Sequence, residues 1–300
     1  MTAAALPRAA GRIAVGDIDV QWLPEVVDKP YAAGFLFPDY ARAAVDPHLD
    51  WLAPRFFDTA AEKFILNTHS YVIRTRRHTI VVDTCLGNDK VRRRYAHLDR
   101  RRAPYLDDLR TMGVDPAAVD FVLCTHLHID HVGWNTRLEN GRWVPTFPNA
   151  RYLFSRTEFA HAAREAKDEP QHSDGSFEDS VVPIVEAGKA EMIEDAHTIT
   201  DGLSIEPTPG HTPGHVALAL TSQGASAVLI GDVVHNPVQY ALPDWNSTFC
   251  LDPVQARRTR RALIERCADT GTVLLPAHFP APTAGRIVSA RGAFRFQELK

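Results

Sequence analysis

The densest group of chemically reactive side chains in the sequence is the stretch Thr125-His126-Leu127-His128-Ile129-Asp130-His131. In extended backbone, alternate side chains point to the same side, so His126 and His128 can bind one metal ion together. If the chain then turns, Asp130 and His131 can address a second ion nearby. Imidazole nitrogens combined with a carboxylate suit zinc. Because packing alone rarely explains such a cluster directly after an apolar strand, we interpret it as a metal site.

Three further side chains that can bind a metal follow apolar segments later in the chain. They are His211 in Pro209-Gly210-His211-Thr212-Pro213-Gly214-His215, Asp232 after Leu229-Ile230-Gly231, and His278 after Leu274-Leu275-Pro276-Ala277. A single histidine at a strand end is more often a structural residue. The first motif and these three features, taken together and in this order, favour a site for two metal ions.

The segments that precede these loops are predicted to be strands. Apolar alternation and short apolar runs predict strands at 13–23, 64–74, 78–83, 120–124, 151–154, 205–208, 216–221, 227–230 and 272–275. Helices are predicted at 104–113, 157–167 and 252–269, the last with Asp252 as N-cap and Pro253 at its first position. Strands that alternate with helices and lead into polar loops indicate a layered α/β domain whose strand ends converge on one site.

Two segments lack this regularity. Residues 24–60 are rich in proline, aspartate and aromatic residues, and we predict an irregular arm or lid with short helices there. Residues 168–180 are polar and contain proline, glycine and serine, which predicts a flexible loop. We therefore expect an N-terminal strand and aromatic arm over residues 1–60, and one larger domain over residues 61–300 that forms a structural unit with it.

Composition excludes several classes of protein. The 300 residues are 45% hydrophobic and 23% charged, with a net charge of −4, so neither a nucleic-acid nor a membrane partner is expected. The basic segment 90–102 is interpreted as the solvated face of a helix. The four cysteines are far apart in the sequence and suggest a reducing, cytoplasmic setting. We expect neither a secretory leader nor a membrane-spanning helix.

The motifs HLHIDH, GHTPGH, GD and a late AH together resemble those of the metallo-β-lactamase superfamily over about residues 64–280. The resemblance implies an α/β fold of four layers, an αββα sandwich with an N-terminal extension and with the metals at one edge of its two sheets. It implies a first metal held by His126, His128 and His211. It implies a second metal held by Asp130, His131 and His278, with Asp232 bridging the two. Asp83, in the segment Val81–Thr84, would support the site from beneath.

Within the superfamily, the layout is most similar to lactonases and methyl-parathion-hydrolase-like enzymes, and also to chlorothalonil-dehalogenase-like hydrolases. Asp232 argues against a true β-lactamase, which lacks a bridging carboxylate at this position. Flavodiiron proteins have glutamate where this chain has His128. Many acyl-homoserine lactonases have a tyrosine three residues after the bridging aspartate, where this chain has His235, with Tyr240 further on. This difference disfavours signalling lactones and leaves simple lactones or esters.

We therefore predict a dinuclear zinc hydrolase in which a metal-bridging hydroxide attacks an ester or lactone of a small, partly apolar substrate. Asp130 is predicted to pass a proton to the leaving group, and His235 to stabilise the oxyanion or to protonate the leaving group. Aromatic residues near the predicted ligands are expected to line the substrate pocket: Trp134, Tyr240, Trp245, Phe249 and Phe279.

Other functions fit the same motifs. Phosphotriester hydrolysis and hydrolytic dehalogenation use the same activated hydroxide. An iron-dependent oxidoreductase or dioxygenase and a regulatory protein with a dead site are alternatives from other classes, and the complete ligand set argues against the last. The two zinc ions are the expected cofactors, with iron, manganese or cobalt left open as the native metal. We expect a small-molecule substrate and a homodimer.

Overall fold

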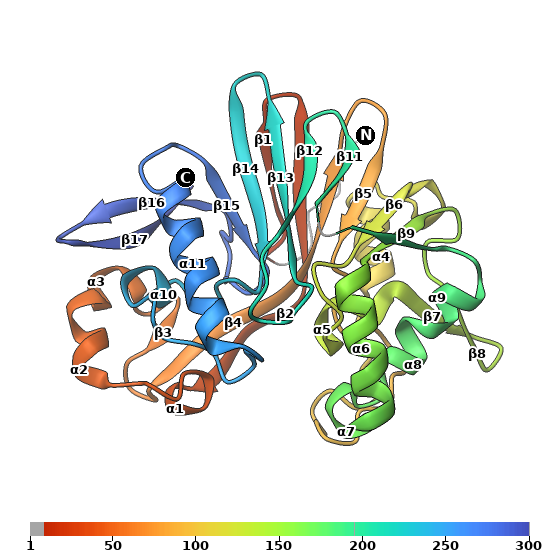
Figure 1. Ribbon diagram of the computed structural model, residues 1–300, viewed down its shortest axis with the longest axis horizontal. Coiled ribbons are helices and arrows are strands. Elements are labelled where there is room, and N and C mark those ends of the chain that lie inside the picture. The colour runs from red at the N-terminus through yellow and green to blue at the C-terminus, as the bar shows by residue number, and fades with distance from the viewer. Residues whose placement is uncertain (1–8, 195, 300) are drawn as a thin grey trace. The chain divides into compact units, whose positions relative to one another are not determined.

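The computed structural model describes residues 9–194 and 196–299, and the chain falls into two units, each made of two segments (Figure 1). Unit 1 comprises Met1–Glu25 and His69–His197, and unit 2 comprises Val26–Thr68 and Thr198–Lys300. The chain passes between the units inside two long strands, β2 (Ile18–Ala32) and β4 (Lys63–Arg74), and again at the start of β11 (His197–Thr200). The single strand predicted at 13–23 is instead a hairpin, because the chain turns at Gly16 and Asp17 between β1 (Gly11–Val15) and β2, and β2 continues to Ala32.

The first sheet has the strand order β1-β2-β4-β5-β6-β9-β10, with β3 paired to β4. Its remaining strands are β1 (Gly11–Val15), β3 (Phe57–Asp58), β5 (Thr79–Val82), β6 (Phe121–Leu123), β9 (Arg151–Ser155) and β10 (Ala190–Ile193). Strands β5, β6, β9 and β10 are parallel neighbours. The three residues of β6 are all buried, as expected for a parallel strand that is covered on both faces. The ends of β5 and β6 therefore lead their loops out at the same edge of the sheet.

Helices cover this part of unit 1. They are α4 (Tyr105–Thr111), α5 (Ile129–Val132), α6 (Arg156–Asp168), α7 (Pro170–Ser173), α8 (Ser176–Ser180) and α9 (Val182–Glu186), with 3₁₀ turns η2 (Pro116–Ala118) and η3 (Gly133–Asn135). A hairpin of β7 (Thr136–Glu139) and β8 (Arg142–Pro145) forms a sheet of its own. Helix α6 packs on β9 and β10, and unit 1 has its own apolar core around Val81, Val122 and Tyr152.

Unit 2 is built on a seven-stranded sheet in sequence order, β11 to β17 (Figure 1). Its strands are β11 (His197–Thr200), β12 (Leu203–Pro207), β13 (Val216–Ser222), β14 (Ala225–Gly231), β15 (Val273–Pro276), β16 (Gly285–Ala290) and β17 (Ala293–Glu298). Strands β12 to β14 form an antiparallel meander, whereas β14 and β15 are parallel. The ends of β12, β14 and β15 therefore lie at one edge of this sheet.

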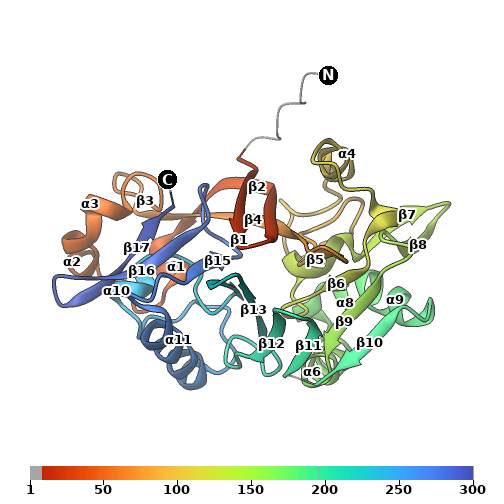
Figure 2. The same cartoon turned by 90° about the horizontal axis from the view of Figure 1, so that it is seen from above.

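Six helical segments belong to unit 2: α1 (Ala33–Leu36), α2 (Arg42–Val45), η1 (Asp46–His48), α3 (Leu49–Leu52), α10 (Val238–Ala241) and α11 (Pro253–Cys267). As predicted, Asp252 caps α11, accepting hydrogen bonds from the backbone N–H groups of Val254 and Gln255. Helix α11 packs against β16, and α10 lies against β17 (Figure 2). The core of unit 2 holds several aromatic rings from the predicted arm, including Phe37, Phe56 and Phe57.

Most predicted strands and helices are confirmed, and besides the hairpin at 13–23 two further segments correct the prediction. Residues 168–180, predicted to be a flexible loop, contain the helical turns α7 and α8, the first of which begins at Pro170. The basic segment 90–102 is not a helix, and Lys90 and Arg92 are buried rather than solvated. The reason is Asp179, whose carboxylate lies 2.6 Å from Arg92 Nη1 and 3.4 Å from Lys90 Nζ. In the part of the chain that the structure describes, no helix combines the length and apolarity needed to cross a membrane.

Candidate metal centre

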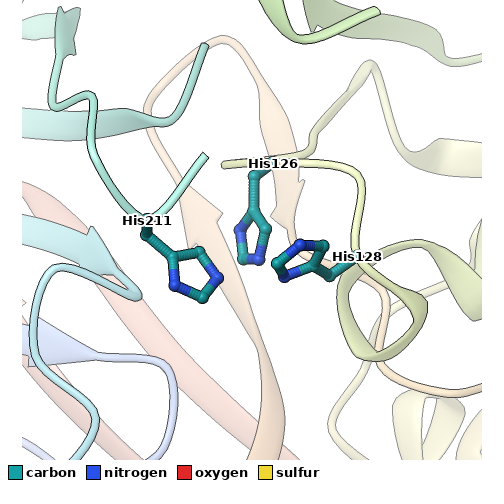
Figure 3. Close-up of side chains that lie close together, drawn as sticks. All are labelled: His126, His128 and His211. Carbon is teal, nitrogen blue, oxygen red and sulfur yellow. The ribbon is translucent and has the colours of Figure 1, made fainter. Parts of the chain in front are cut away.

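In unit 1 the predicted histidine motif forms the loop after β6 and continues into α5 (Figure 3). His126 and His128 lie on the extended part, where their ring centroids are 4.6 Å apart. His128 occupies the N-cap position of α5, so the chain turns there and brings His131 back to within 4.0 Å of the His126 ring. This is the extended segment followed by a turn that the spacing predicts. Asp130 is more accessible than His131, with 28% of its side chain exposed.

Asp83 lies directly behind this loop, at the end of β5. Its carboxylate accepts hydrogen bonds from the backbone N–H and the hydroxyl of Thr125, at 2.7 and 2.9 Å, and lies 2.9 Å from His131 Nδ1. Because a carboxylate accepts, the Nδ1 of His131 carries the proton, and its Nε2 presents a lone pair. Asp83 has a φ of +54°, a conformation that costs free energy in most residues. The arrangement suits an imidazole that is prepared to bind a metal.

The loops after β5 and before β7 are bound to each other through their backbones. Thr84 N–H donates to His131 O, Gly133 N–H to Cys85 O and Trp134 N–H to Thr84 O, each at 2.7 Å. Gly133 is required here, because a Cβ at this position would lie 1.9 Å from the carbonyl carbon of Leu86. The segment that carries His131 is thus fixed against the segment that carries Asp83.

In unit 2 three imidazoles surround one carboxylate. Asp232 follows β14, and its oxygens lie 3.4 Å from His211 Nε2, 3.2 Å from His235 Nε2 and 3.1 Å from His278 Nε2. His278 follows β15, the parallel neighbour of β14, and His211 lies in the loop between β12 and β13 (Figure 3). All four side chains are buried. The sheet therefore collects at one edge the metal-capable groups that are far apart in the sequence.

The proton positions in this cluster fit a bound cation. His278 Nδ1 lies 2.8 Å from the carbonyl oxygen of Asn67, so this nitrogen carries the proton and Nε2 presents a lone pair to the carboxylate. Two acceptors that face each other in a buried site are unfavourable unless a proton or a cation lies between them. Burial lowers the pKa of His235, which favours the neutral imidazole. The imidazoles of His211 and His278 and the carboxylate of Asp232 are groups that zinc binds well.

His215 is a functional residue that the motif analysis quoted but did not assign. Its Nε2 accepts a hydrogen bond from the backbone N–H of Asp232 at 3.0 Å, so its proton is on Nδ1, which lies 2.8 Å from Thr208 Oγ1. His215 thereby fixes the backbone that carries the central carboxylate. The signal for this role was the second histidine of the GHTPGH stretch, which follows the ligand candidate His211 by four residues.

The structure gives most of the aromatic residues predicted for the substrate pocket a packing role. Tyr240 and Phe279 are fully buried in the core of unit 2, and Trp245 belongs to the same core. Trp134 lies in the core of unit 1, stacked on Tyr105. Phe249 differs from these, because its ring stacks beside His235 at 6.2 Å. Large rings near a sheet edge are most stable inside, so burial gives these residues a packing role, and their contact with substrate stays a prediction.

A family model described as the metallo-beta-lactamase superfamily matches residues 65–278. Among curated proteins, an N-acyl homoserine lactonase from Bacillus sp. is 24% identical over 183 residues, covering 57% of this chain and 65% of that protein. The N-acyl homoserine lactonase AttM from Azorhizobium caulinodans is 26% identical over 184 residues, covering 57% of this chain and 62% of that protein. The chain thus matches less than two thirds of the length of these relatives.

Two solved structures share the fold over almost the whole chain. A hydrolase of the beta lactamase superfamily, AbOPH, has a TM-score of 0.80 at 23% identity, covering 97% of both chains. AidC, a dizinc quorum-quenching lactonase in complex with a product, has a TM-score of 0.76 at 19% identity, covering 97% of both chains. These likenesses identify the metallo-β-lactamase fold, a mixed α/β architecture with several sheets.

Proposed function

The chain belongs to the metallo-β-lactamase superfamily, and from this membership we propose that it is a dinuclear zinc hydrolase of small, partly apolar lactones or esters. The observation that carries the proposal is Asp232, a buried carboxylate surrounded by the Nε2 atoms of three histidines. The curated relatives are described as N-acyl homoserine lactonases, which supports a cyclic ester as the substrate class.

The proposed ligands follow the family pattern. One ion is held by His126, His128 and His211, and the other by Asp130, His131 and His278, with Asp232 shared. In unit 1 the proton on His131 Nδ1 leaves Nε2 available, and in unit 2 the proton on His278 Nδ1 does the same. Both supports are of the kind that fixes the tautomer of a metal-binding histidine.

Two zinc ions bound to these residues would activate a water molecule and polarise the substrate carbonyl. The protein's own groups then direct the reaction. Asp130, whose side chain is partly exposed, is proposed to carry a proton to the leaving alkoxide as the carbon–oxygen bond of the ester breaks. His235 is proposed to act as a hydrogen-bonding group, because its imidazole lies against the Asp232 carboxylate. Its Nε2 lies 3.3 Å from Ser247 Oγ as well as 3.2 Å from Asp232.

The test is the zinc and iron content per chain of protein purified without added metal, followed by assays with a lactone, an aryl ester and a phosphotriester. Two zinc ions per chain with turnover of the lactone or ester support the proposal. Preferred turnover of the phosphotriester would replace the proposed substrate class and keep the metal centre. A single iron without hydrolysis would contradict the proposed function and favour an oxidoreductase.

A further inference from the structure

Glu25, in the middle of β2, joins two loops of unit 1 with its two carboxylate oxygens. Oε1 accepts a hydrogen bond from the indole Nε1–H of Trp134, and Oε2 accepts one from the backbone N–H of Leu86, both at 2.8 Å. Leu86 lies three residues after Asp83, and Trp134 lies three residues after His131. We propose that Glu25 is a positioning residue of the metal centre, which holds the loop of Asp83 and the loop of His131 at a fixed spacing.

The backbone of the first loop explains why an external support is needed. Asp83, Cys85 and Gly87 have φ angles of +54°, +50° and +77°, and the left-handed region is unfavourable for the first two. Backbone hydrogen bonds hold the loop in this form: Thr84 is bonded to His131 and Trp134, and Cys85 accepts from Gly133. None of these backbone bonds reaches Leu86. Glu25 adds a link between Leu86 and Trp134 through its two oxygens.

Trp134 transmits this support because its ring cannot turn freely. Its indole stacks on the Tyr105 ring, with centroids 5.0 Å apart and an angle of 12° between the planes. The Tyr105 hydroxyl in turn lies 2.7 Å from Ser70 Oγ, which lies 3.3 Å from Cys85 Sγ in the first loop. Trp134 is therefore held by its face through Tyr105 and by its edge through Glu25. A shift of either contact moves the chain that carries His131.

The charge of Glu25 fits this role. Burial raises the pKa of its carboxyl group, and the hydrogen bonds from Leu86 and Trp134 oppose the rise, as does the guanidinium of Arg101. A carboxylate can accept one N–H donor on each of its two oxygens. An amide in its place accepts only on its single oxygen, because its other end is itself a donor. Glu25→Gln therefore removes one contact while it preserves size.

The experiment compares Glu25→Gln, Trp134→Phe and the double variant with wild type and with Glu139→Gln, a control at an exposed glutamate of the same unit. Both zinc affinities are measured by competition with a chelator, the Co²⁺-substituted proteins are compared by visible absorption, and the melting temperature of each metal-free protein is recorded. This inference depends on the proposed function, so the metal content of the wild type is measured first.

We expect Glu25→Gln to lower the affinity for one of the two zinc ions about tenfold, the range seen for groups that orient metal ligands. The variant should also change the Co²⁺ absorption spectrum. The metal-free melting temperature and the other affinity should stay within error. Trp134→Phe should have the same effect, and the double variant should be no worse than either single one. Two zinc ions with unchanged affinity in both single variants, or equal weakening of both ions together with lower metal-free stability, would overturn this inference alone. A wild type without metal would overturn the proposed function and this inference together.

Discussion

The candidate ligands of the two units use a carboxylate in opposite ways. In unit 1, Asp83 lies behind the histidine loop and contacts His131 through Nδ1, which leaves Nε2 as the nitrogen proposed to bind a metal. In unit 2, Asp232 lies in front and meets three histidines through Nε2. The first carboxylate fixes a tautomer, whereas the second is a proposed ligand whose charge a cation would balance. The same residue type therefore has different consequences depending on which imidazole nitrogen it meets.

The two units also support their loops with opposite charges. In unit 1 the carboxylate of Glu25 accepts from two loops. In unit 2 the guanidinium of Arg260, which is fully buried on α11, donates to the carbonyl oxygens of Val233, Pro243 and Trp245 at 3.0, 2.7 and 2.8 Å. These residues belong to the segment that follows Asp232. An anion suits loops whose backbone N–H groups take no part in strand pairing, because it accepts their hydrogen bonds. A buried cation suits a loop that presents carbonyl groups, because it donates to them.

The most decisive test of the difference between the two carboxylates is to remove the charge of Asp232. Asp232→Asn should lower kcat/KM for a lactone or ester at least about a thousandfold, about 4 kcal/mol in the barrier, and should reduce the metal content. The control is Asp244→Asn, an exposed aspartate of the same unit that pairs with Arg261. Full activity with two metals in Asp232→Asn would show that this carboxylate is not a ligand.

Arg260→Met tests the support of the loop after Asp232. Three carbonyl oxygens lose their donor, while a buried charge is removed, so we expect the free energy of unfolding to fall by about 2–3 kcal/mol. Burial lowers the pKa of Arg260 to about 10, which shows that the charge itself is costly. Urea denaturation measures the effect, with Arg258→Met on the exposed face of α11 as the control. Equal stability of the two variants would contradict the role assigned to Arg260.

Asp83→Asn tests the carboxylate that lies behind the histidine loop. The amide still accepts from the Thr125 backbone, but it no longer selects the Nδ1–H tautomer of His131. We expect one zinc to bind about 10 to 100 times more weakly, and we expect a smaller decrease in the catalytic rate. Chelator competition measures it against Asp120→Asn, which also accepts a backbone N–H but at the other end of β6. A weakening as large as that of Asp232→Asn would mean that Asp83 is itself a ligand.

The smallest expected effect concerns Lys90, a buried cation of unit 1 whose pKa is lowered to about 7, chiefly by burial. Between pH 7 and its ordinary value of 10.5 the unfolded chain holds the Lys90 proton and the folded chain does not, so stability from this group rises with pH in that window. We therefore expect the unfolding free energy of wild type, relative to that of Lys90→Met, to rise by about 1–2 kcal/mol between pH 7 and pH 9.

The measurement for Lys90 is urea denaturation at pH 6, 7, 8 and 9, with the exposed Lys167→Met as the control. The wild-type and Lys90→Met curves should be parallel below pH 7 and diverge above it. Curves that stay parallel throughout would show that Lys90 is charged in the folded protein, neutralised by Asp179, over the whole range.

The amount of the site that the sequence could predict differs between the units. The spacing within residues 126–131 predicts the extended pair and the turn, because neighbours in sequence are held by local backbone geometry. The convergence of His211, Asp232 and His278 followed from strand ends, since parallel strands deliver their loops to one edge. Neither argument reached His215 or Glu25, whose partners lie 17 and 109 residues away and leave no periodic signal.

The sequence by itself determined the types of the candidate ligands, their order and the strands that carry them, because apolar periodicity and motif spacing are local properties. Only the tertiary structure decided which imidazole nitrogen faces each carboxylate, which aromatic rings are core, and that Lys90 and Arg92 are buried. Those outcomes depend on partners far along the chain, such as Asp179 for the two cations. Burial and hydrogen-bond satisfaction are properties of the folded surroundings, so residue type and spacing alone do not contain them.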